Sequence, residues 1–318
     1  MADVGCAGIL VADMLCGPMA ELPKEGQLLA VDAMPSKSGG CAGNAAVGLA
    51  KQGLAVDVVG CLGKDAAAKI VLSSLEDCGV NCEQVTCCDG YPTSQTVILL
   101  VEGHDRRYIH CFGANRAFSC EHISSSWLSG LKAFYLGGFF AMPSVKGEQL
   151  REVLDTCRKN GVTTIVDVVI PQTLSGFGEL EPLLPLIDFF VPSDDEAAQI
   201  TGQSDPVDQV RAIQERGAKT VVITQGKKGA IAASGKDLWR SASYKVDVID
   251  PSGSGDAFTG GLIAAALRGW EMPRVLAYAA ALGASATRAI GCTDGVFSAQ
   301  EAEAFLEAHT LPIEHTLL

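Results

Sequence analysis

The sequence of 318 residues has no uncharged apolar stretch of about 18 residues, the length that a transmembrane helix needs. Aromatic residues make up only 6%, and 24 basic residues face 37 acidic ones, for a net charge of −13. So little positive charge argues against partners such as nucleic acid or an anionic membrane, because both are bound through basic surface. The first residues lack a basic segment and include Asp3 and Asp13, so we expect no secretory signal peptide.

The twelve cysteines lack the spacings of a zinc ribbon. Cys87 and Cys88 could bind a metal together with Cys78 and Cys82, but the x3 and x4 spacings between these residues argue against it. The five histidines form no HxxH or HxxxH pair. Cysteines scattered through a long chain are typical of reduced, buried thiols, so we expect a cytoplasmic protein.

Apolar residues make up 48% of the chain, enough for a substantial core, and strand-like segments alternate with helix-like ones. The strand-like segments are 4–11, 55–59, 133–136, 162–166, 187–191, 220–224 and 244–249, and the helix-like segments are 43–52, 65–77, 146–160, 194–201, 206–216, 255–268 and 273–288. This alternation predicts an α/β fold with a doubly wound, mostly parallel sheet flanked by helices.

Two regions break the alternation and read as antiparallel strands, Gln27–Ser36 and Thr93–Phe112. The second contains a turn signal at Glu102–Asp105. We therefore expect one domain, residues 1–318, with a small antiparallel β-lid formed by about residues 14–36 and 93–113. A small sheet cannot cover both of its faces, so we also expect a homodimer that forms through the lid. The apolar residues expected to form that contact are Leu28, Leu29, Val31, Val97, Leu99, Val101, Ile109 and Phe112.

The segment Asp250–Gly261, DPSGSGDAFTGG, carries the clearest chemistry. Its small residues at 252–255 precede an apolar helix, so several backbone N–H groups can converge on an anion at the helix N-terminus. Asp256 lies at the same N-terminus, where the helix dipole favours its ionised form, as a general base in phosphoryl transfer requires. A glycine-rich turn with Asp256 as an ordinary helix cap is the plain alternative.

The segment Ser38–Ala46, SGGCAGNAA, is the second candidate. Gly39, Gly40 and Gly43 allow the backbone to approach a ligand closely, and Asn44 supplies both a donor and an acceptor. A loop in which Asn44 caps a helix explains the same residues equally well.

Together the two segments resemble the two signatures of the ribokinase-like (PfkB) carbohydrate kinases. Gly39-Gly40-x-x-Gly43-Asn44-Ala45-Ala46 is similar to the N-terminal signature, and Asp250–Phe258 is similar to the C-terminal one, D-T-T-G-A-G-D-x-F. The resemblance extends to Asp13, to the hairpin exit Gly113–Asn115 and to Thr224–Gly229, and it covers about residues 3–297. It implies a ribokinase-like domain with a β-lid and ATP-dependent phosphorylation of a hydroxyl.

The resemblance also implies a role for individual residues. Asp256 would be the catalytic base, and the backbone of Gly253, Ser254 and Gly255 would hold the transferring phosphoryl group. The implied substrate-binding residues are Asp13, Gly39, Gly40 and Asn44. The implied nucleotide-side residues are Thr224, Gly226 and Gly229, with Glu196 positioning the water shell of Mg²⁺. Many members also bind a monovalent cation, which we expect here to be K⁺ held by Asp250 and Ser252 with groups near Ala286 and Gly291.

Several positions depart from the family pattern. Ser193 replaces the asparagine of the N-x-x-E motif that ends at Glu196. Val11 and Cys41 replace polar residues typical of a ribose site, and Leu136–Phe140 is apolar where a glutamate often follows. Sugar hydroxyls left without partners are costly, so we do not expect a ribokinase. Phe139 and Phe140 could stack on a substrate, although aromatics after a strand are more often core.

The sequence therefore predicts an ATP-dependent kinase of a small sugar or sugar-like substrate. A nucleoside kinase of the same fold is the alternative, since apolar residues at 11, 41 and 139 would also suit a base. A non-catalytic sugar or nucleotide sensor is a less favoured alternative, because a sensor would not need Asp256 beside an anion-binding turn. A Rossmann dehydrogenase is excluded because no G-x-G-x-x-G follows the first strand.

Overall fold

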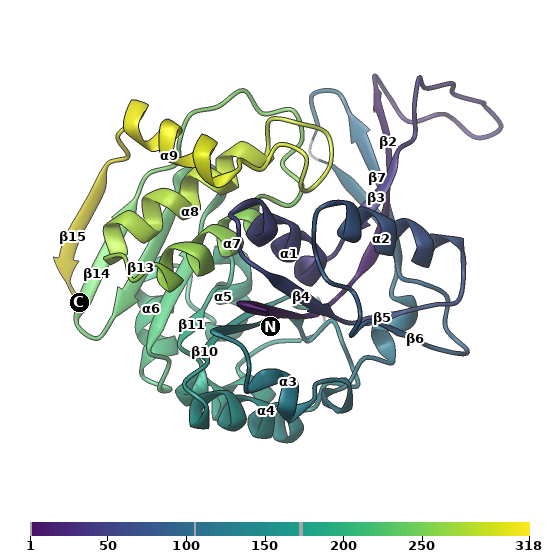
Figure 1. The fold of residues 1–318 in the computed structure, drawn as a ribbon. Helices are drawn as coiled ribbons and strands as arrows, with labels where there is room; N and C mark the ends of the chain where they lie inside the picture. Colours follow the sequence, from purple (N-terminus) through teal and green to yellow (C-terminus); the bar gives the residue numbers. More distant parts are fainter. Residues whose placement is uncertain (1, 105, 172–173) are drawn as a thin grey trace.

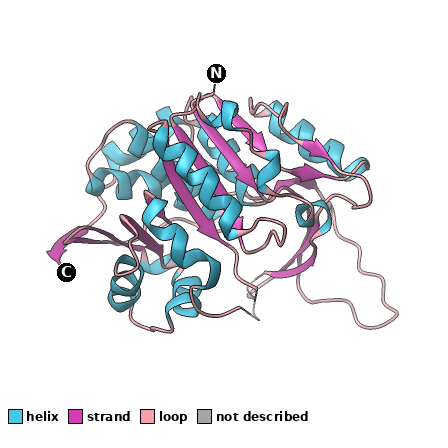
Figure 2. Cartoon of the chain, turned by 90° about the horizontal axis from the view of Figure 1, so that it is seen from below, coloured by secondary structure: helices cyan, strands magenta, loops and turns pink. Residues whose placement is uncertain are grey.

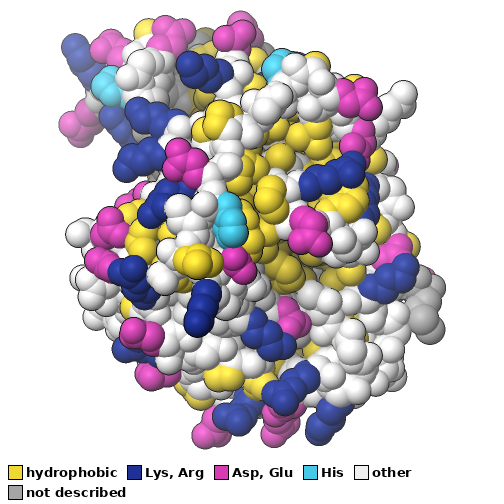
Figure 3. Space-filling view, turned by 90° about the vertical axis from the view of Figure 1, so that its left-hand side faces the viewer, with side chains coloured by type: hydrophobic (Ala, Val, Ile, Leu, Met, Phe, Trp, Pro, Cys, Tyr) yellow, Lys and Arg dark blue, Asp and Glu magenta, His cyan; other side chains and the backbone are white. Residues whose placement is uncertain are grey.

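The computed structural model describes residues 2–104, 106–171 and 174–318. It contains a large sheet with helices on both faces and a smaller sheet to one side (Figure 1). No helix in these described residues is long and apolar enough to cross a membrane. On the face at the left of Figure 1, basic side chains are scattered among acidic ones around a band of hydrophobic side chains (Figure 3).

The large sheet has nine strands in the order β15-β14-β13-β12-β11-β10-β9-β1-β4. Six run parallel: β4 Val56–Val59, β1 Val4–Gly8, β9 Ala133–Phe139, β10 Thr163–Val168, β11 Phe189–Phe190 and β12 Thr220–Thr224. The antiparallel strands β13 Ala230–Ser234, β14 Asp237–Ser241 and β15 Ile313–Leu317 continue it to one edge. Every residue of β1 and β9 is buried, as expected for central parallel strands covered on both faces.

Helices form a layer on each face of the sheet (Figure 2). One layer contains α1 Cys41–Lys51, α2 Ala66–Asp77, α7 Ser254–Leu267, α8 Met272–Ala286 and α9 Ala299–Ala308. The other contains α3 Ser125–Leu128, α4 Gly147–Lys159, η3 Gly178–Leu186, α5 Asp194–Thr201 and α6 Pro206–Gln214. Each layer covers its own buried apolar cluster, so the predicted doubly wound α/β fold is confirmed.

The smaller sheet has four strands, β3 Ser36–Gly39, β2 Val11–Met19, β7 Gln95–Val101 and β8 Arg107–Cys111. The pairs β2–β3 and β7–β8 are antiparallel, whereas β2 and β7 run parallel. The predicted hairpin is therefore confirmed as β7–β8; its turn prediction includes residue 105, which lies outside the described residues. Two short strands, β5 Cys61–Leu62 and β6 Thr86–Cys87, form a third sheet.

Three strand predictions were wrong. Residues 20–35 form a projecting loop, visible at the upper right of Figure 1, and only Ser36 of the predicted strand Gln27–Ser36 is in a strand. Residues 244–249 are also loop, and no strand in the described part of the chain pairs with them. The predicted strand 4–11 is split after Gly8, where the chain leaves the large sheet and enters β2 of the smaller one.

Candidate active site

A cavity of about 330 Å³ lies between the smaller sheet and the first turns of α1 and α7. Predicted site residues and residues of the smaller sheet line it together. Its lining residues are Ile9, Val11, Asp13, Gly40, Cys41, Asn44, Thr96, Ile98, Tyr108, His110, Phe112, Asn115, Ala141, Val169, Ser252, Gly253, Asp256 and Cys292. The tertiary structure thus brings together segments that are some 200 residues apart in the sequence.

The N-terminus of α7 forms one wall of the cavity. Gly253 precedes the helix in a left-handed conformation, with φ of 72° and ψ of 2°. A Cβ atom at this position would lie 2.4 Å from the carbonyl oxygen of Cys292, so only glycine fits here. Ser254 to Asp256 form the first turn, whose N–H groups have no partners within the helix. A Cβ on Gly255 would meet no atom within 4 Å, so there is open space next to this turn. Unpaired N–H groups at a helix N-terminus suit an anion.

Asp256 is held in this turn by the side chain of Asn44 on α1. The Nδ2 of Asn44 donates a hydrogen bond of 2.8 Å to Oδ2 of Asp256. Burial raises the pKa of the Asp256 carboxyl above its ordinary value, while hydrogen bonds from Asn44 and Cys41 lower it. The Oδ1 of Asn44 is buried without a partner among the described residues, which leaves an acceptor free for a substrate hydroxyl.

Asp13 lies on β2 and lines the cavity. The pKa of its carboxyl is raised to about 6, mainly by burial and in part by the negative charge of Asp256, against the lowering effect of bonds from Thr96 and Cys292. The thiol of Cys292 lies 3.6 Å from Oδ2 of Asp13. Gly39 on β3 packs directly against this carboxylate, and a Cβ there would lie 1.8 Å from Oδ2. Gly39 therefore makes room for the Asp13 side chain.

Asp250 is fully buried just before α7. Its Oδ1 accepts a hydrogen bond of 2.9 Å from the N–H of Ser252, and its Oδ2 accepts one of 2.9 Å from the N–H of Gly291. The Oγ of Ser252 is buried with no hydrogen-bond partner among the described residues. A buried carboxylate beside a free hydroxyl oxygen supplies the oxygen ligands that a cation needs.

The predicted nucleotide-side residues lie together where β11 and β12 end, but they do not line the cavity. Ser193 is bridged to Thr224 and caps α5: its N–H and hydroxyl donate to Oε2 of Glu196, at 2.8 and 2.7 Å. Burial raises the pKa of Glu196, and the charge of Asp256 adds to that rise. Gly226 and Gly229 form the turn after β12 and both have positive φ, 54° and 103°.

A buried polar group next to Asp256 involves the two strands β9 and β10 and the two helices α1 and α7. The hydroxyl of Tyr135 donates to Oδ2 of Asp167, and the N–H of Gly138 donates to Oδ1 over 2.5 Å. One ligand atom each of Cys41, Asp167 and Asp256 lies within 4.8 Å of the others. Burial raises the pKa of Asp167 well above its ordinary value, and the charge of Asp256 raises it further. Asp167 was not predicted from the sequence.

The hairpin β7–β8 supplies cavity residues that the motifs did not indicate. Thr96 pairs with His110 and Ile98 pairs with Tyr108, so all four side chains lie on one face of the hairpin. The Oγ1 of Thr96 lies 3.0 Å from Nδ1 of His110. The alternation of strand side chains could have indicated this inward-facing set from the sequence. No sequence signal indicated Cys292.

Two further sequence-based expectations concern the pair Phe139 and Phe140 and the hairpin exit at Asn115. Phe139 is buried core with 1% exposure, Phe140 packs against the same core, and neither lines the cavity, so the pair has the core position that aromatics after a strand more often have. Asn115 lines the cavity, yet its amide is engaged with the backbone of Leu10 in both directions, at 3.1 and 3.0 Å. Asn115 therefore anchors the hairpin exit to the strand of Asp13.

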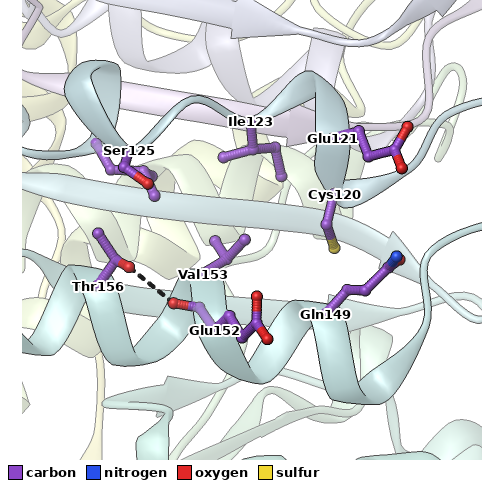
Figure 4. Close-up of a pocket in the computed structure, with 9 residues that line it drawn as sticks. Cys120, Glu121, Ile123, Ser125, Gln149, Glu152, Val153 and Thr156 are labelled. Carbon is purple, nitrogen blue, oxygen red and sulfur yellow. Dashed lines mark hydrogen bonds between the residues drawn. The ribbon is translucent and has the colours of Figure 1, made fainter.

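A second cavity, of about 260 Å³, lies between α4 and the segment around α3 (Figure 4). Cys120, Glu121, Gln149 and Glu152 are among the side chains around it, and Oγ1 of Thr156 bonds the backbone oxygen of Glu152 over 2.8 Å. It contains none of the predicted site residues. The cavity with Asp13 and Asp256 is therefore the candidate active site.

Comparison with known proteins agrees with this geometry. The family model of the pfkB family carbohydrate kinases matches residues 1–298. The chain is 29% identical to a ribokinase of Arabidopsis thaliana, covering 82% of this chain and 69% of that protein. It is 25% identical to the aminoimidazole riboside kinase of Salmonella typhimurium, covering 88% and 93%.

Among solved structures, a ribokinase-like protein of E. coli in complex with ATP and Mg²⁺ superposes with a TM-score of 0.83. The two chains share 22% identity over 97% of this chain and 100% of that one, a likeness that establishes the fold. The family model matches nearly the whole chain, and this match establishes the family as well as the fold. This protein belongs to the pfkB family of carbohydrate kinases, ATP-dependent enzymes that transfer a phosphoryl group to a hydroxyl group of their substrate.

Proposed function

We propose that this kinase phosphorylates a hydroxyl of a small sugar or sugar-like molecule bound between Asp13 and Asp256. The observation that carries the proposal is the position of Asp256: it lies in the first turn of α7, bonded by Asn44, and it faces the cavity that Asp13 also lines. A carboxylate beside a helix N-terminus can accept a proton from a hydroxyl while the N–H groups hold the transferring phosphoryl group.

In this proposal Asp13, Gly39, Gly40 and Asn44 bind the sugar hydroxyls. Asp256 takes the proton of the attacking hydroxyl, and the backbone at Gly253, Ser254 and Gly255 stabilises the charge on the γ-phosphoryl group. The turn of Thr224, Gly226 and Gly229 accommodates the nucleotide of ATP. Glu196 would help to hold Mg²⁺ through its water shell, and the bound ion would neutralise phosphate charge.

The smaller sheet is proposed to act as the lid of a single kinase domain, residues 1–318. Its hairpin contributes Ile98, Tyr108 and Phe112 to one side of the cavity. The lid segments of about 14–36 and 93–113 contain β7, β8 and most of β2, but only Ser36 of β3. Closure over the substrate would exclude water, which otherwise competes as the phosphoryl acceptor.

A nucleoside is the second candidate substrate, favoured by the apolar side of the cavity. Ile98, Tyr108 and Phe112 present apolar surface that a base could contact, and one relative is named for a riboside. An ADP-release assay on pentoses, hexoses, keto-acid sugars and nucleosides tests both. Turnover of a sugar supports the first proposal, and turnover of nucleosides alone replaces it with the second. Ligand-induced stabilisation without any turnover would contradict both and indicate a sensor.

The raised pKa of Asp13 predicts a pH dependence of substrate binding. Ionised Asp13 accepts bonds from hydroxyls through both of its oxygens and binds them more strongly than the protonated form, and its pKa is raised to about 6. We expect kcat/KM on the best substrate to fall as pH decreases below about 6, because kcat/KM follows the ionisation of the free enzyme. The free energy of unfolding should have the opposite pH dependence. It should decrease as pH rises from about 4 to about 6, since the folded state favours the protonated carboxyl of Asp13.

The variant Asp13→Asn tests this assignment. It should raise KM at pH 8 and remove the transition near pH 6 from the profile of kcat/KM. An unchanged midpoint in Asp13→Asn would assign the transition to another group.

We also propose that Asp250, Ser252 and Gly291 hold a monovalent cation, with K⁺ as the occupant. The buried carboxylate of Asp250 and the unpartnered Oγ of Ser252 support this assignment. The cation would order the loop before α7 and so shape the anion site. We expect higher turnover in potassium chloride than in tetramethylammonium chloride, and Asp250→Asn should abolish the difference. Equal rates of the wild-type enzyme in both salts would contradict the proposal.

The protein is further proposed to form a homodimer through the lid. Ile109 is 64% exposed and Leu28 is 91% exposed, and both lie on the smaller sheet or its loop. A second copy of the same apolar surface would cover them. Val101 does not belong to this surface, because it is buried.

We expect Ile109→Glu to convert a wild-type dimer into a monomer in sedimentation velocity at micromolar concentration. Val248→Glu is the matched control, because Val248 is similarly exposed, at 60%, but lies outside the smaller sheet. Monomeric wild-type protein, or dissociation by the control variant alone, would refute a lid-mediated dimer.

We further propose a reducing location such as the cytoplasm. All twelve cysteines are unpaired in the structure, which supports this proposal.

A further inference from the structure

Two sulfurs and a ring nitrogen meet at a place that the kinase reaction does not use. They belong to Cys61 on β5, to Cys88 directly after β6 and to His122 on the short helix η2, Cys120–His122. These three ligand atoms lie within 4.8 Å of one another, and Sγ of Cys61 lies 3.4 Å from Nε2 of His122. None of the three residues lines either cavity described above.

The spacing of these atoms agrees with a tetrahedral metal ion. With bonds of about 2.3 Å to sulfur and about 2.0 Å to nitrogen, tetrahedral zinc places a sulfur and a nitrogen ligand about 3.5 Å apart and two sulfurs about 3.8 Å apart. The observed sulfur–nitrogen distance of 3.4 Å is close to the first value. The two sulfurs lie within 4.8 Å of each other, so small side-chain rotations would bring them to the sulfur–sulfur distance of a zinc site.

The surroundings of His122 orient its Nε2 towards the two sulfurs. Its Nδ1 lies 3.1 Å from the carbonyl oxygen of Ser119, and the ring of Phe118 stacks on the imidazole at a centroid distance of 5.5 Å. When Nδ1–H donates to that carbonyl, the lone pair of Nε2 is free to bind a metal, an arrangement common among metal-ligating histidines. The N–H of Ser119 also lies 3.2 Å from Nδ1, so the ring can adopt the other tautomer without a metal.

We propose that Cys61, Cys88 and His122 form a binding site for Zn²⁺ or a similar thiophilic divalent ion, with water as the fourth ligand. Two thiolates and an imidazole match the preference of such ions for sulfur and nitrogen. Cys61 is buried, whereas Cys88 and His122 are partly exposed, so an ion can enter from solvent. The site involves Cys88, one of the cysteines considered from the sequence, but with partners that the spacing rule could not indicate.

The site would act as a structural clip at the base of the β7–β8 hairpin. Cys88 precedes β7, and His122 follows β8 and the short helix η1, Gly113–Arg116. A metal bound to Cys88 and His122 would therefore link the two ends of the segment that contains the hairpin, and its bond to Cys61 would attach them to β5. Since binding to the folded state alone stabilises it, the metal should raise the melting temperature.

The experiment uses the full-length protein, reduced and freed of metal under anaerobic conditions, and titrates it with Co²⁺. We expect one equivalent to produce the visible bands of tetrahedral cobalt and a near-ultraviolet thiolate-to-cobalt band, and Zn²⁺ to displace it. Cys61→Ser, Cys88→Ser and His122→Asn should each lower the affinity by at least the roughly 10–100-fold that loss of an outer-shell partner costs. Cys82→Ser is the control, because Cys82 is also partly buried but lies outside the cluster.

Several outcomes would overturn the site. They are the absence of a thiolate-to-cobalt band in the reduced wild-type protein, an unchanged band in the double variant Cys61→Ser/Cys88→Ser, and loss of the band in Cys82→Ser. A Cys61–Cys88 disulfide in protein purified without reductant, with no metal uptake after reduction, would replace the metal site with a redox pair. The wild-type spectrum itself counts the thiolates bound, so the test holds even if a variant fails to fold.

Discussion

Replacing Asp256 with Asn should lower kcat by about 10²–10⁴, the usual contribution of a general base, and leave the fold intact. The amide has the same shape and can still accept the bond from Nδ2 of Asn44, but it cannot take the proton of the attacking hydroxyl. Because burial raises the pKa of Asp256, the ionised carboxylate destabilises the folded state, so the neutral variant should melt at the same or a higher temperature.

The matched control for this experiment is Asp208→Asn. Asp208 is also an acidic residue in the first turn of a helix, α6, but it is exposed and pairs with Arg211 over 3.3 Å. Steady-state ADP release and thermal unfolding should be measured on both variants with the best substrate from the panel. Turnover of Asp256→Asn within a few-fold of wild type would remove Asp256 from the role of base. An equal loss in Asp208→Asn would show that the effect is not specific to the cavity.

Gly253→Ala should lower kcat by about 10²–10³, the cost of losing a preorganised hydrogen-bond donor at a developing negative charge. Alanine disfavours the φ of 72° at this position, and its Cβ would collide with the carbonyl oxygen of Cys292 at 2.4 Å. The turn must therefore shift, and the N–H groups at the start of α7 shift with it. We also expect a loss of stability of about 1–3 kcal/mol from the strained backbone.

Two further glycine variants separate catalysis from stability. Gly48→Ala in α1 introduces a Cβ that meets no atom within 4 Å, so it should keep full activity and gain up to about 1 kcal/mol. Gly255→Ala also meets no protein atom within 4 Å, yet it fills the space proposed for the phosphoryl group. It should fold normally and lose turnover. A fully active Gly253→Ala enzyme, or an inactive Gly48→Ala enzyme, would contradict the proposed role of the α7 turn.

The sequence alone determined the class of fold, because the hydrophobic period of each segment is a local property. Buried runs such as 220–224 and amphipathic stretches such as 65–77 became the strands and helices expected of them. The hairpin β7–β8 was predicted for the same reason, from its turn signal and the alternation of its side chains. The two glycine-rich segments also indicated Asn44 and Asp256 as candidate site residues, since each is part of a continuous motif, and the structure places both in the lining of the same cavity.

Only the tertiary structure decided which apolar runs have a strand beside them and which distant side chains meet. The runs 27–35 and 244–249 have residues that suit strands, but they pair with no strand of the described residues, so they are loops. The contact of Gly39 with Asp13, the unpartnered hydroxyl of Ser252, and the meeting of Cys61, Cys88 and His122 likewise depend on how the elements are connected. Sequence spacing reports separation along the chain, whereas a site depends on distances in space, and those are set by the order of strands in the sheets and the packing of helices against them.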